Sequence, residues 1–281
     1  MRESGRMSDL AAALRVGPGF TLADIDPDST PGYRGDHDDG DKDLAKGAVE
    51  LDGLQERLFA NKDHDPRSVL LVLQGMDTAG KGGIVRHVVG SVDVQGVRLR
   101  AFKKPTEEEL AHDFLWRVRR ELPGPGYLGV FDRSHYEDVL IGRVRELAPA
   151  EEIERRYGAI VDFENEAIAA GTVIVKAMLH ISAEEQHDRL AERLERPDKY
   201  WKFNPGDLAE RALWSDYQEA YQLALERTST SAAPWHVVPA NRKWYARLAV
   251  QQLLLEAFAS LGQGWPPPDF DVDEQRRLLG D

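Results

Sequence analysis

The chain has 281 residues, of which 42% are hydrophobic and 30% charged, a composition typical of a folded globular protein. It contains no cysteine, which excludes disulfides, thiolate metal sites and a cysteine nucleophile. The formal net charge of −13 argues at first against a polyanionic ligand such as nucleic acid or a phosphate polymer, although basic residues gathered in clusters can still produce a local positive field. No apolar run approaches the roughly 20 residues of a membrane helix. We therefore expect one core, no membrane partner and a cytoplasmic location.

The first 46 residues are rich in glycine, proline and aspartate and predict an extended N-terminal arm without a core of its own. The acidic run over 36–41 reads as a solvated loop, since it lacks the glutamate and spacing of a calcium loop. Leucines and alanines at helical spacing then predict a helix over 43–61. We expect a folded domain over 47–265 and a proline-containing tail over 266–281.

A buried strand followed by a glycine turn is the most informative stretch. Residues 69–74 are almost all aliphatic and predict a strand buried on both faces, and a helix should begin near Lys81. The spacing Gly75-x4-Gly80-Lys81 is typical of a phosphate-binding loop, in which backbone N–H groups and a lysine face anionic oxygens. The predicted phosphate-binding residues here are Gly75, Thr78, Ala79, Gly80, Gly82 and Gly83.

One position of this loop is unusual. Gly82 stands where such loops usually carry Ser or Thr as a ligand of Mg²⁺. Asp77, inside the loop, is a candidate replacement because carboxylates are good ligands for hard cations. The alternative is that Asp77 only shapes the loop through an Asx turn.

The rest of the chain alternates between strands and helices. Further strands are predicted over 96–102, 127–131, 172–181 and 235–238. Helices are predicted over 81–90, 106–122, 137–147, 150–170, from 183 onward, 207–227 and 242–261, the second with a Thr106/Glu109 capping box. This order predicts an α/β fold, a three-layer αβα sandwich with a five-stranded parallel sheet.

Charged residues follow two of the predicted strands. Lys103 and Lys104 end the second strand, and Asp132 and Arg133 end the third. Because ligands of parallel sheets gather at the carboxyl ends of the strands, Asp132 is expected to meet Asp77 there and to bind Mg²⁺. A helix cap or turn is the alternative role for Asp132 alone.

Arginine suits phosphate contacts, so Arg133 is expected to bind phosphate, and Lys103 and Lys104 to contribute together with Arg117 in the next basic cluster.

A third cluster of charge lies after the fourth strand. Arg189, Arg193 and Arg196 recur at four and three residues and so line one face of a helix that ends before Pro197, with Lys199 and Lys202 close behind. A row of cations suits several phosphates in succession, and we expect a helical lid over about 186–212. The alternative is a solvated face paired with neighbouring glutamates.

Three motifs resemble the polyphosphate kinase 2 family: Gly75-Met-Asp-Thr-Ala-Gly-Lys-Gly-Gly83, Phe131-Asp-Arg-Ser-His-Tyr-Glu-Asp138 and Lys199-Tyr-Trp-Lys-Phe-Asn-Pro-Gly-Asp-Leu-Ala-Glu-Arg211. The resemblance, from about residue 19 to about residue 261, implies a thymidylate-kinase-like P-loop kinase fold with a helical lid. It also implies phosphate transfer between inorganic polyphosphate and nucleotides that depends on Mg²⁺, with Mn²⁺ as an alternative ion.

Carried over by position, the family's catalytic residues fall on Asp77, Lys81, Asp132 and Arg133, and the two aspartates would hold the metal. The family's lid cations fall on Arg189, Arg193, Lys199 and Lys202.

Two further segments, 105–117 and 20–27, look most like the subgroup that phosphorylates both nucleoside mono- and diphosphates. The resemblance therefore implies AMP and ADP as acceptors and a homo-oligomer, a dimer or tetramer. One alternative is an ATP-dependent nucleotide or nucleoside kinase that does not use polyphosphate. Another is a nucleotide-binding switch without turnover, although a GTPase would normally carry Ser or Thr after the loop lysine.

Overall fold

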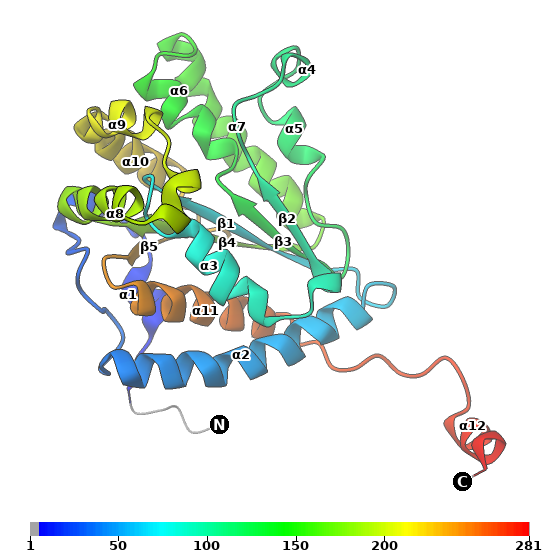
Figure 1. Cartoon of the computed structure of the whole chain (residues 1–281). Helices are drawn as coiled ribbons and strands as arrows, with labels where there is room; N and C mark the ends of the chain where they lie inside the picture. The colour runs from blue at the N-terminus through cyan, green and yellow to red at the C-terminus, as the bar shows by residue number, and fades with distance from the viewer. Residues whose placement is uncertain (1–5, 281) are drawn as a thin grey trace.

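Five parallel strands form the centre of the molecule. A computed structural model describes residues 6–280. Its strands are β1 (Ser68–Gly75), β2 (Val97–Ala101), β3 (Leu128–Asp132), β4 (Thr172–His180) and β5 (Trp235–Pro239), and they are ordered β2-β3-β1-β4-β5 in one sheet. Helices cover both faces of the sheet (Figure 1), so the predicted three-layer α/β architecture is confirmed.

Strand β1 lies at the centre because it is apolar on both faces. It pairs with β3 on one side and β4 on the other, and all of its residues are buried. Alternate side chains point to opposite faces. Leu71 and Leu73 join the core under α2 (His37–Ala60), α3 (Lys81–His87) and α11 (Lys243–Ser260), whereas Leu70 and Val72 join the core under α7 (Ala150–Ala169) and α10 (Trp214–Thr228).

The N-terminal segment is more regular than expected. Helix α2 begins at His37, so the prediction of a solvated loop over 36–41 was wrong. Asp36 caps this helix by accepting a hydrogen bond from the N–H of Asp39. Further carboxylates in the first turn stabilise the helix by interacting with the positive end of its dipole. Upstream lie α1 (Leu10–Leu14) and the 3-10 turn η1 (Leu22–Asp24), whose leucines are buried against the two cores.

Three predicted helices are broken into shorter pieces. The segment 106–122 forms α4 (Glu107–Leu110), with the predicted capping box, and α5 (Trp116–Arg119). Between them the Asp113 carboxylate accepts from the N–H of Leu115 at 3.0 Å, a local bond that competes with the helix. The segment 137–147 forms η4 (His135–Asp138) and α6 (Ile141–Val144), and 207–227 forms α9 (Gly206–Arg211) and α10.

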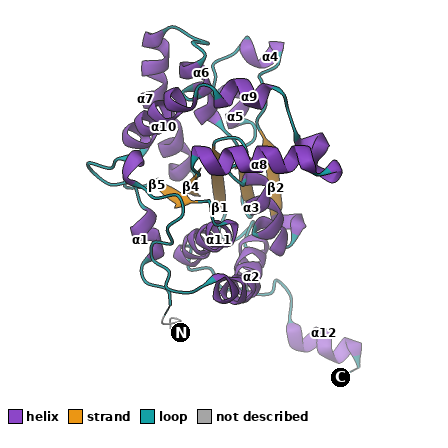
Figure 2. Ribbon diagram, turned by 60° about the vertical axis from the view of Figure 1, so that its left-hand side comes forward, coloured by secondary structure: helices purple, strands orange, loops and turns teal. Residues whose placement is uncertain are grey.

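The lid consists of α8 (Ala183–Glu195), the 3-10 helix η5 (Pro197–Lys202) and α9. It lies at the edge of the sheet where the strands end, with α8 across the front in Figure 2. Short 3-10 turns η2 (Val89–Ser91) and η3 (Val94–Gly96) connect α3 to β2.

The C-terminal helix α12 (Val272–Leu279) has no buried residue and projects away from the body (Figure 1). Within residues 6–280, no helix combines the length and apolarity that crossing a membrane requires.

Candidate active site

The turn between β1 and α3 has backbone geometry that restricts its sequence. Gly75 and Gly80 have φ values of 148° and 115°, where side chains are disfavoured. A Cβ at Gly75 would also lie 2.6 Å from the carbonyl oxygen of Leu179. Thr78 adopts a φ of 66° despite its branched side chain. The loop therefore requires glycine at positions 75 and 80, and it holds Thr78 in a backbone conformation that a branched residue rarely adopts.

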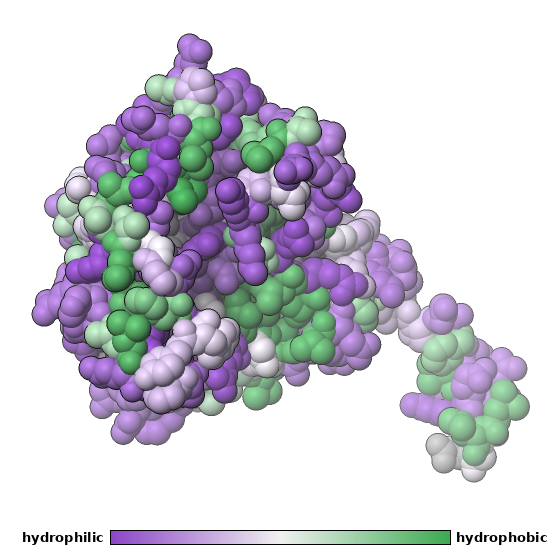
Figure 3. All heavy atoms as spheres, turned by 45° about the horizontal axis from the view of Figure 1, so that its top comes forward, coloured by the Kyte–Doolittle hydropathy of each residue, from purple (hydrophilic) through white to green (hydrophobic). Residues whose placement is uncertain are grey.

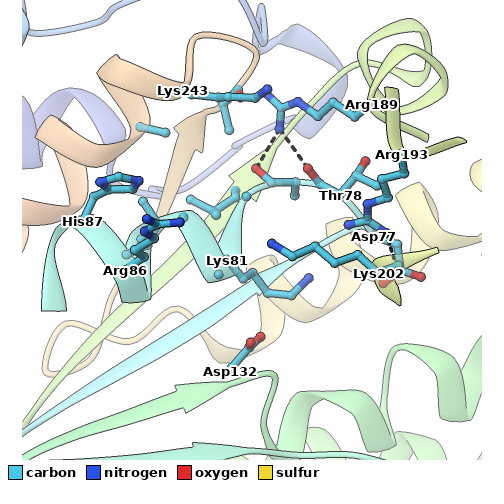
Figure 4. Close-up of a pocket in the computed structure, with 18 of the residues that line it drawn as sticks. Asp77, Thr78, Lys81, Arg86, His87, Asp132, Arg189, Arg193, Lys202 and Lys243 are labelled. Carbon is cyan, nitrogen blue, oxygen red and sulfur yellow. Dashed lines mark hydrogen bonds between the residues drawn. The ribbon is translucent and has the colours of Figure 1, made fainter. Parts of the chain in front are cut away.

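Lys81 lies buried beneath this loop. Its Nζ donates to the carbonyl oxygen of Gly75 at 2.6 Å and to that of Met76 at 3.3 Å. Burial lowers the pKa of Lys81, and the charge of Arg133 lowers it further, while Asp77 and Asp132 act in the opposite direction. Figure 4 shows the ammonium group directed to the same space as the Asp132 carboxylate.

Asp77 and Arg133 form an ion pair between the loop and the end of β3. The distance from Arg133 Nη2 to Asp77 Oδ1 is 2.6 Å. Burial alone would lower the pKa of Arg133, but the carboxylates of Glu137 and Asp77 raise it overall. The backbone of Arg133 has a φ of 62°, and its N–H donates to the carbonyl oxygen of Leu73 at 3.0 Å. The guanidinium thus stays charged and fixed next to the loop.

A cavity of about 560 Å³ opens over the loop, and we call it the basic cavity. Figure 3 shows hydrophilic side chains gathered around a hollow on this side of the molecule. Three carboxylates line it, Asp77, Asp132 and Glu192. Among residues 6–280, eleven Lys and Arg side chains line it: Lys81, Arg86, Lys103, Arg133, Arg189, Arg193, Arg196, Lys199, Lys202, Lys243 and Arg247. A strongly acidic protein therefore carries a concentrated positive field at one place.

A second cavity of about 210 Å³ adjoins the first, and Asp77 and Arg133 line both. Its charge is the reverse, since Arg133 is its one Lys or Arg among the described lining residues. Four carboxylates line it, from Asp77, Glu137, Asp207 and Glu210, together with Gly75, Asn204, Tyr217 and Tyr221. Burial raises the pKa of Glu137, against the opposing charges of Arg133 and Lys81. This cavity suits hydrogen-bonding polar groups rather than a polyanion.

The structure brings most of the predicted residues to these cavities. Thr78, Ala79, Gly80, Gly82 and Gly83 line the basic cavity, as do Lys103 and the five lid cations, and Gly75 lines the second.

Lys104 and Arg117 line neither cavity. The Arg117 guanidinium is buried and donates to the carbonyl oxygen of Lys103 at 2.9 Å and to Asp138 at 3.2 Å. It therefore supports the backbone that carries Lys103, and the Lys104 side chain is exposed to solvent.

Three cations of the basic cavity were not predicted from the sequence, namely Arg86, Lys243 and Arg247. Lys243 begins the helix that follows β5, and Arg247 lies one turn later. Because ligands gather at the carboxyl ends of parallel strands, the positions of Lys243 and Arg247 just after β5 could have predicted that they line the cavity. Arg86 lies on α3 beyond Lys81, and only the packing of α3 against α11 reveals that it faces the cavity.

The two aspartates fit a metal that arrives with a phosphate ligand. Among residues 6–280 there is no group of three or more His, Asp or Glu side chains arranged to hold an ion. Asp77 and Asp132 line the same cavity, however, and Mg²⁺ is commonly bound by one or two carboxylates with water and substrate phosphates. The donor set therefore suits a shared ion of this kind.

Three features together define a P-loop phosphotransferase. They are a phosphate-binding loop on the central strand of a parallel sheet, an aspartate that ends the neighbouring strand, and a cationic lid.

Comparisons with known proteins identify the family. The model of the family described as polyphosphate kinase 2 matches residues 34–262. A Meiothermus ruber protein named AMP/ADP-polyphosphate phosphotransferase is 46% identical over 89% of this chain and 92% of its own. A Rhodopseudomonas palustris protein named ADP-polyphosphate phosphotransferase is 43% identical over 80% and 81% of the two chains.

Among solved structures, polyphosphate kinase 2 from Arthrobacter aurescens TC1 is 58% identical, with a TM-score of 0.95 over 98% of this chain and 97% of that one. The chain belongs to the polyphosphate kinase 2 family.

Proposed function

We propose that this protein transfers phosphoryl groups between inorganic polyphosphate and nucleotides, converting AMP to ADP and ADP to ATP, with Mg²⁺ as the natural ion and Mn²⁺ as an alternative. The observation that carries the proposal is the basic cavity, whose eleven Lys and Arg side chains exceed what the phosphates of one nucleotide need. The names of the Meiothermus ruber and Rhodopseudomonas palustris relatives support the same pair of substrates.

The two cavities suggest how the substrates divide the site. Polyphosphate takes the basic cavity, and the nucleoside part of the nucleotide takes the second one, where carboxylates, Asn204 and tyrosines can bind hydroxyl and amino groups. The reacting phosphates then meet at the Asp77–Arg133 pair, which both cavities share. This arrangement keeps the two substrates apart except at the transferring group.

The chemistry requires mainly positioning and charge. The attacking atom is a phosphate oxygen that is already ionised, so the site needs no strong base. Lys81 and Arg133 stabilise the negative charge of the loose transition state, and the loop backbone holds the phosphates in line. Asp77 and Asp132 would hold the metal, which when bound supplies neutralisation of the phosphate oxygens.

The test uses purified protein with long-chain polyphosphate, Mg²⁺ and either AMP or ADP, and measures ADP and ATP by chromatography. We expect ADP from AMP, ATP from ADP, and loss of both products when the metal is chelated. Absence of transfer with polyphosphate, alongside transfer with ATP as donor, would instead identify an ATP-dependent kinase. Tight nucleotide binding without turnover would identify a switch.

Two further properties belong to this proposal as expectations from family resemblance, a homo-oligomeric state and a cytoplasmic location. Sedimentation or light scattering of the full chain measures the first, and fractionation of cells measures the second.

A further inference from the structure

One turn of the lid helix α8 binds the backbone of the phosphate-binding loop. Gln186 and Arg189 lie three residues apart on α8, and both side chains are buried. Gln186 Nε2 donates to the carbonyl oxygen of Asp77 at 3.2 Å. Arg189 Nη1 donates to the carbonyl oxygens of Thr78 at 2.9 Å and Ala79 at 3.1 Å, as Figure 4 shows. Three successive carbonyl groups of the loop are thus bound by two side chains.

The guanidinium of Arg189 has no donor left for a phosphate. An arginine side chain has five N–H groups. Two go to the loop, one from Nε goes to Glu185 Oε1 at 2.6 Å, and two from Nη2 go to the carbonyl oxygens of Ala240 at 2.7 Å and Asn241 at 3.0 Å. The side chain borders the basic cavity, yet each N–H has a protein acceptor.

These bonds orient the loop amides. In a planar trans peptide the C=O and the following N–H point in opposite directions. Carbonyl groups of residues 77–79 that face α8 therefore turn the N–H groups of residues 78–80 away from α8. The N–H of Ala79 donates within the loop to the carbonyl oxygen of Met76 at 3.1 Å. Within residues 6–280, this leaves the N–H groups of Thr78 and Gly80 directed away from the lid without a protein acceptor.

The same bonds hold the strained residue. Thr78 has a φ of 66°, a conformation that a β-branched residue keeps only when its surroundings impose it. Its own carbonyl group is one of the three that α8 binds, and the next peptide is held as well. Gln186 in turn accepts from Arg211 Nη1 of α9 at 3.0 Å, which connects the far side of the lid to the same unit.

We propose that Gln186 and Arg189 are positioning residues that clamp the phosphate-binding loop in its binding conformation, and that Arg189 does not itself bind polyphosphate. This proposal rests on the proposed function and assigns to Arg189 a role different from that of the other lid cations. The first half of α8, together with the end of α9 that Arg211 connects to it, is then a fixed part of the loop, and only the lid between them is free to close over substrate.

Hydrogen–deuterium exchange of the ligand-free protein tests the clamp without any assay of activity. The variants are Gln186→Met and Arg189→Met, with Arg155→Met, an exposed arginine of α7, as the matched control. We expect exchange of a peptide covering residues 76–82 to rise severalfold in the two clamp variants, with core strands unchanged, and not in the control. Unchanged loop exchange in both clamp variants would overturn the proposal.

Kinetics then separate positioning from direct binding. We expect Gln186→Met to lower kcat about tenfold with AMP and ADP alike, because a small misplacement of the loop weakens every phosphate contact. Arg189→Lys should lose about as much as Arg189→Met, since one ammonium group cannot bind the five acceptors. The double variant should lose little more than the worse single variant, because both side chains hold one loop.

The opposite pattern would make Arg189 a polyphosphate ligand. In that case Arg189→Lys would keep most of kcat, its KM would rise for polyphosphate alone, and Gln186→Met would behave like the wild type. If the wild-type protein showed no transfer, the proposed function would fail while the exchange experiment would still decide the clamp.

Discussion

The two cavities share a wall but differ in almost every other respect. The basic cavity is wide and lined by eleven Lys and Arg side chains, whereas the second is less than half its volume and lined by four carboxylates and one arginine. The difference in charge shows that a single chain with a net charge of −13 can present a strong positive field and a negative one side by side. Net charge alone would not have predicted the positive one.

The shared wall joins the two cavities to which the proposed function assigns the two substrates of one reaction. Asp77 and Arg133 neutralise each other across 2.6 Å, so this wall adds no net charge to either cavity. Under the proposed division of substrates, a polyanion entering from one side and a nucleotide entering from the other would both reach this pair. Variants that affect one cavity, the other, or the wall should therefore give distinct kinetic signatures.

The largest effect is expected at the wall and its metal ligands. Asp132→Asn should lower kcat at least about 100-fold with either nucleotide, because under the proposed function the amide would remove a charge that holds the metal at the transferring phosphate. Asp63→Asn, an exposed carboxylate after α2, is the control. A variant with full kcat would show that Asp132 does not take part in the chemistry.

The basic cavity should respond next. Combining Lys243→Ala with Arg247→Ala is expected to raise KM for polyphosphate about tenfold or more, because hydrogen bonds to charged groups contribute roughly 1.5–3 kcal/mol each. KM for the nucleotide should stay within twofold. Arg143→Ala, which removes a surface pair with Glu219, is the control. An equal rise in both KM values would contradict the proposal that polyphosphate and the nucleotide bind in separate cavities.

The second cavity should give the converse result with a smaller effect. Asn204→Ala is expected to raise KM for AMP and ADP about fivefold, the effect of one neutral hydrogen bond, and to leave KM for polyphosphate unchanged. The exposed Gln95→Ala on η3 is the control. If only the KM for polyphosphate changed, the nucleotide would bind outside the second cavity.

The pH profile reports on Lys81. Burial lowers the pKa of Lys81 below its ordinary value of 10.5 in the free enzyme, whereas bound phosphates favour the charged form. Affinity should therefore fall as pH rises through the lowered pKa, and kcat/KM should halve at a pH below 10.5. The Lys81→Arg variant should not show this fall of kcat/KM at alkaline pH, because arginine stays protonated. If kcat/KM fell in the same way in Lys81→Arg, the fall would be due to the titration of another group.

The smallest effect is expected from the C-terminal segment. Deleting residues 266–281 should leave both KM values unchanged and shift Tm by no more than about 1 °C, because α12 buries no side chain against the body. Calorimetry and the standard transfer assay measure the two quantities. A large loss of Tm would show that this segment packs against another copy of the chain.

Sequence patterns predicted the elements whose causes are local. The aliphatic strand β1, the glycine positions of the loop and the Thr106 capping box depend on neighbouring residues, and the structure contains all of them. The helix break at Asp113 depends on a single side chain that competes with a long helical pattern, and neither it nor the break after Arg211 was predicted.

The chemistry of the site could be predicted from the sequence, but the complete set of residues that form it could not. Asp77, Lys81 and Asp132 follow strand ends, where a general rule applies. The saturation of Arg189 by five acceptors depends on contacts with residues about 50 and 110 positions away, which no periodicity encodes. For the same reason the carboxylate-lined second cavity, built from four separate segments, had no signal in the sequence.

The central place of β1 governs when the site can appear during folding. Ser68 lies beside Thr172, 104 residues further along the chain, and β1 also pairs with β3 on its other side. Closing loops of that length costs conformational entropy before the strand pairings compensate for it, which slows folding of parallel sheets. On a ribosome, the phosphate-binding loop emerges early yet stays without its neighbours until β4, α8 and the α11 cations Lys243 and Arg247 have been synthesised. The capacity to bind phosphate is therefore among the last properties that the nascent chain acquires.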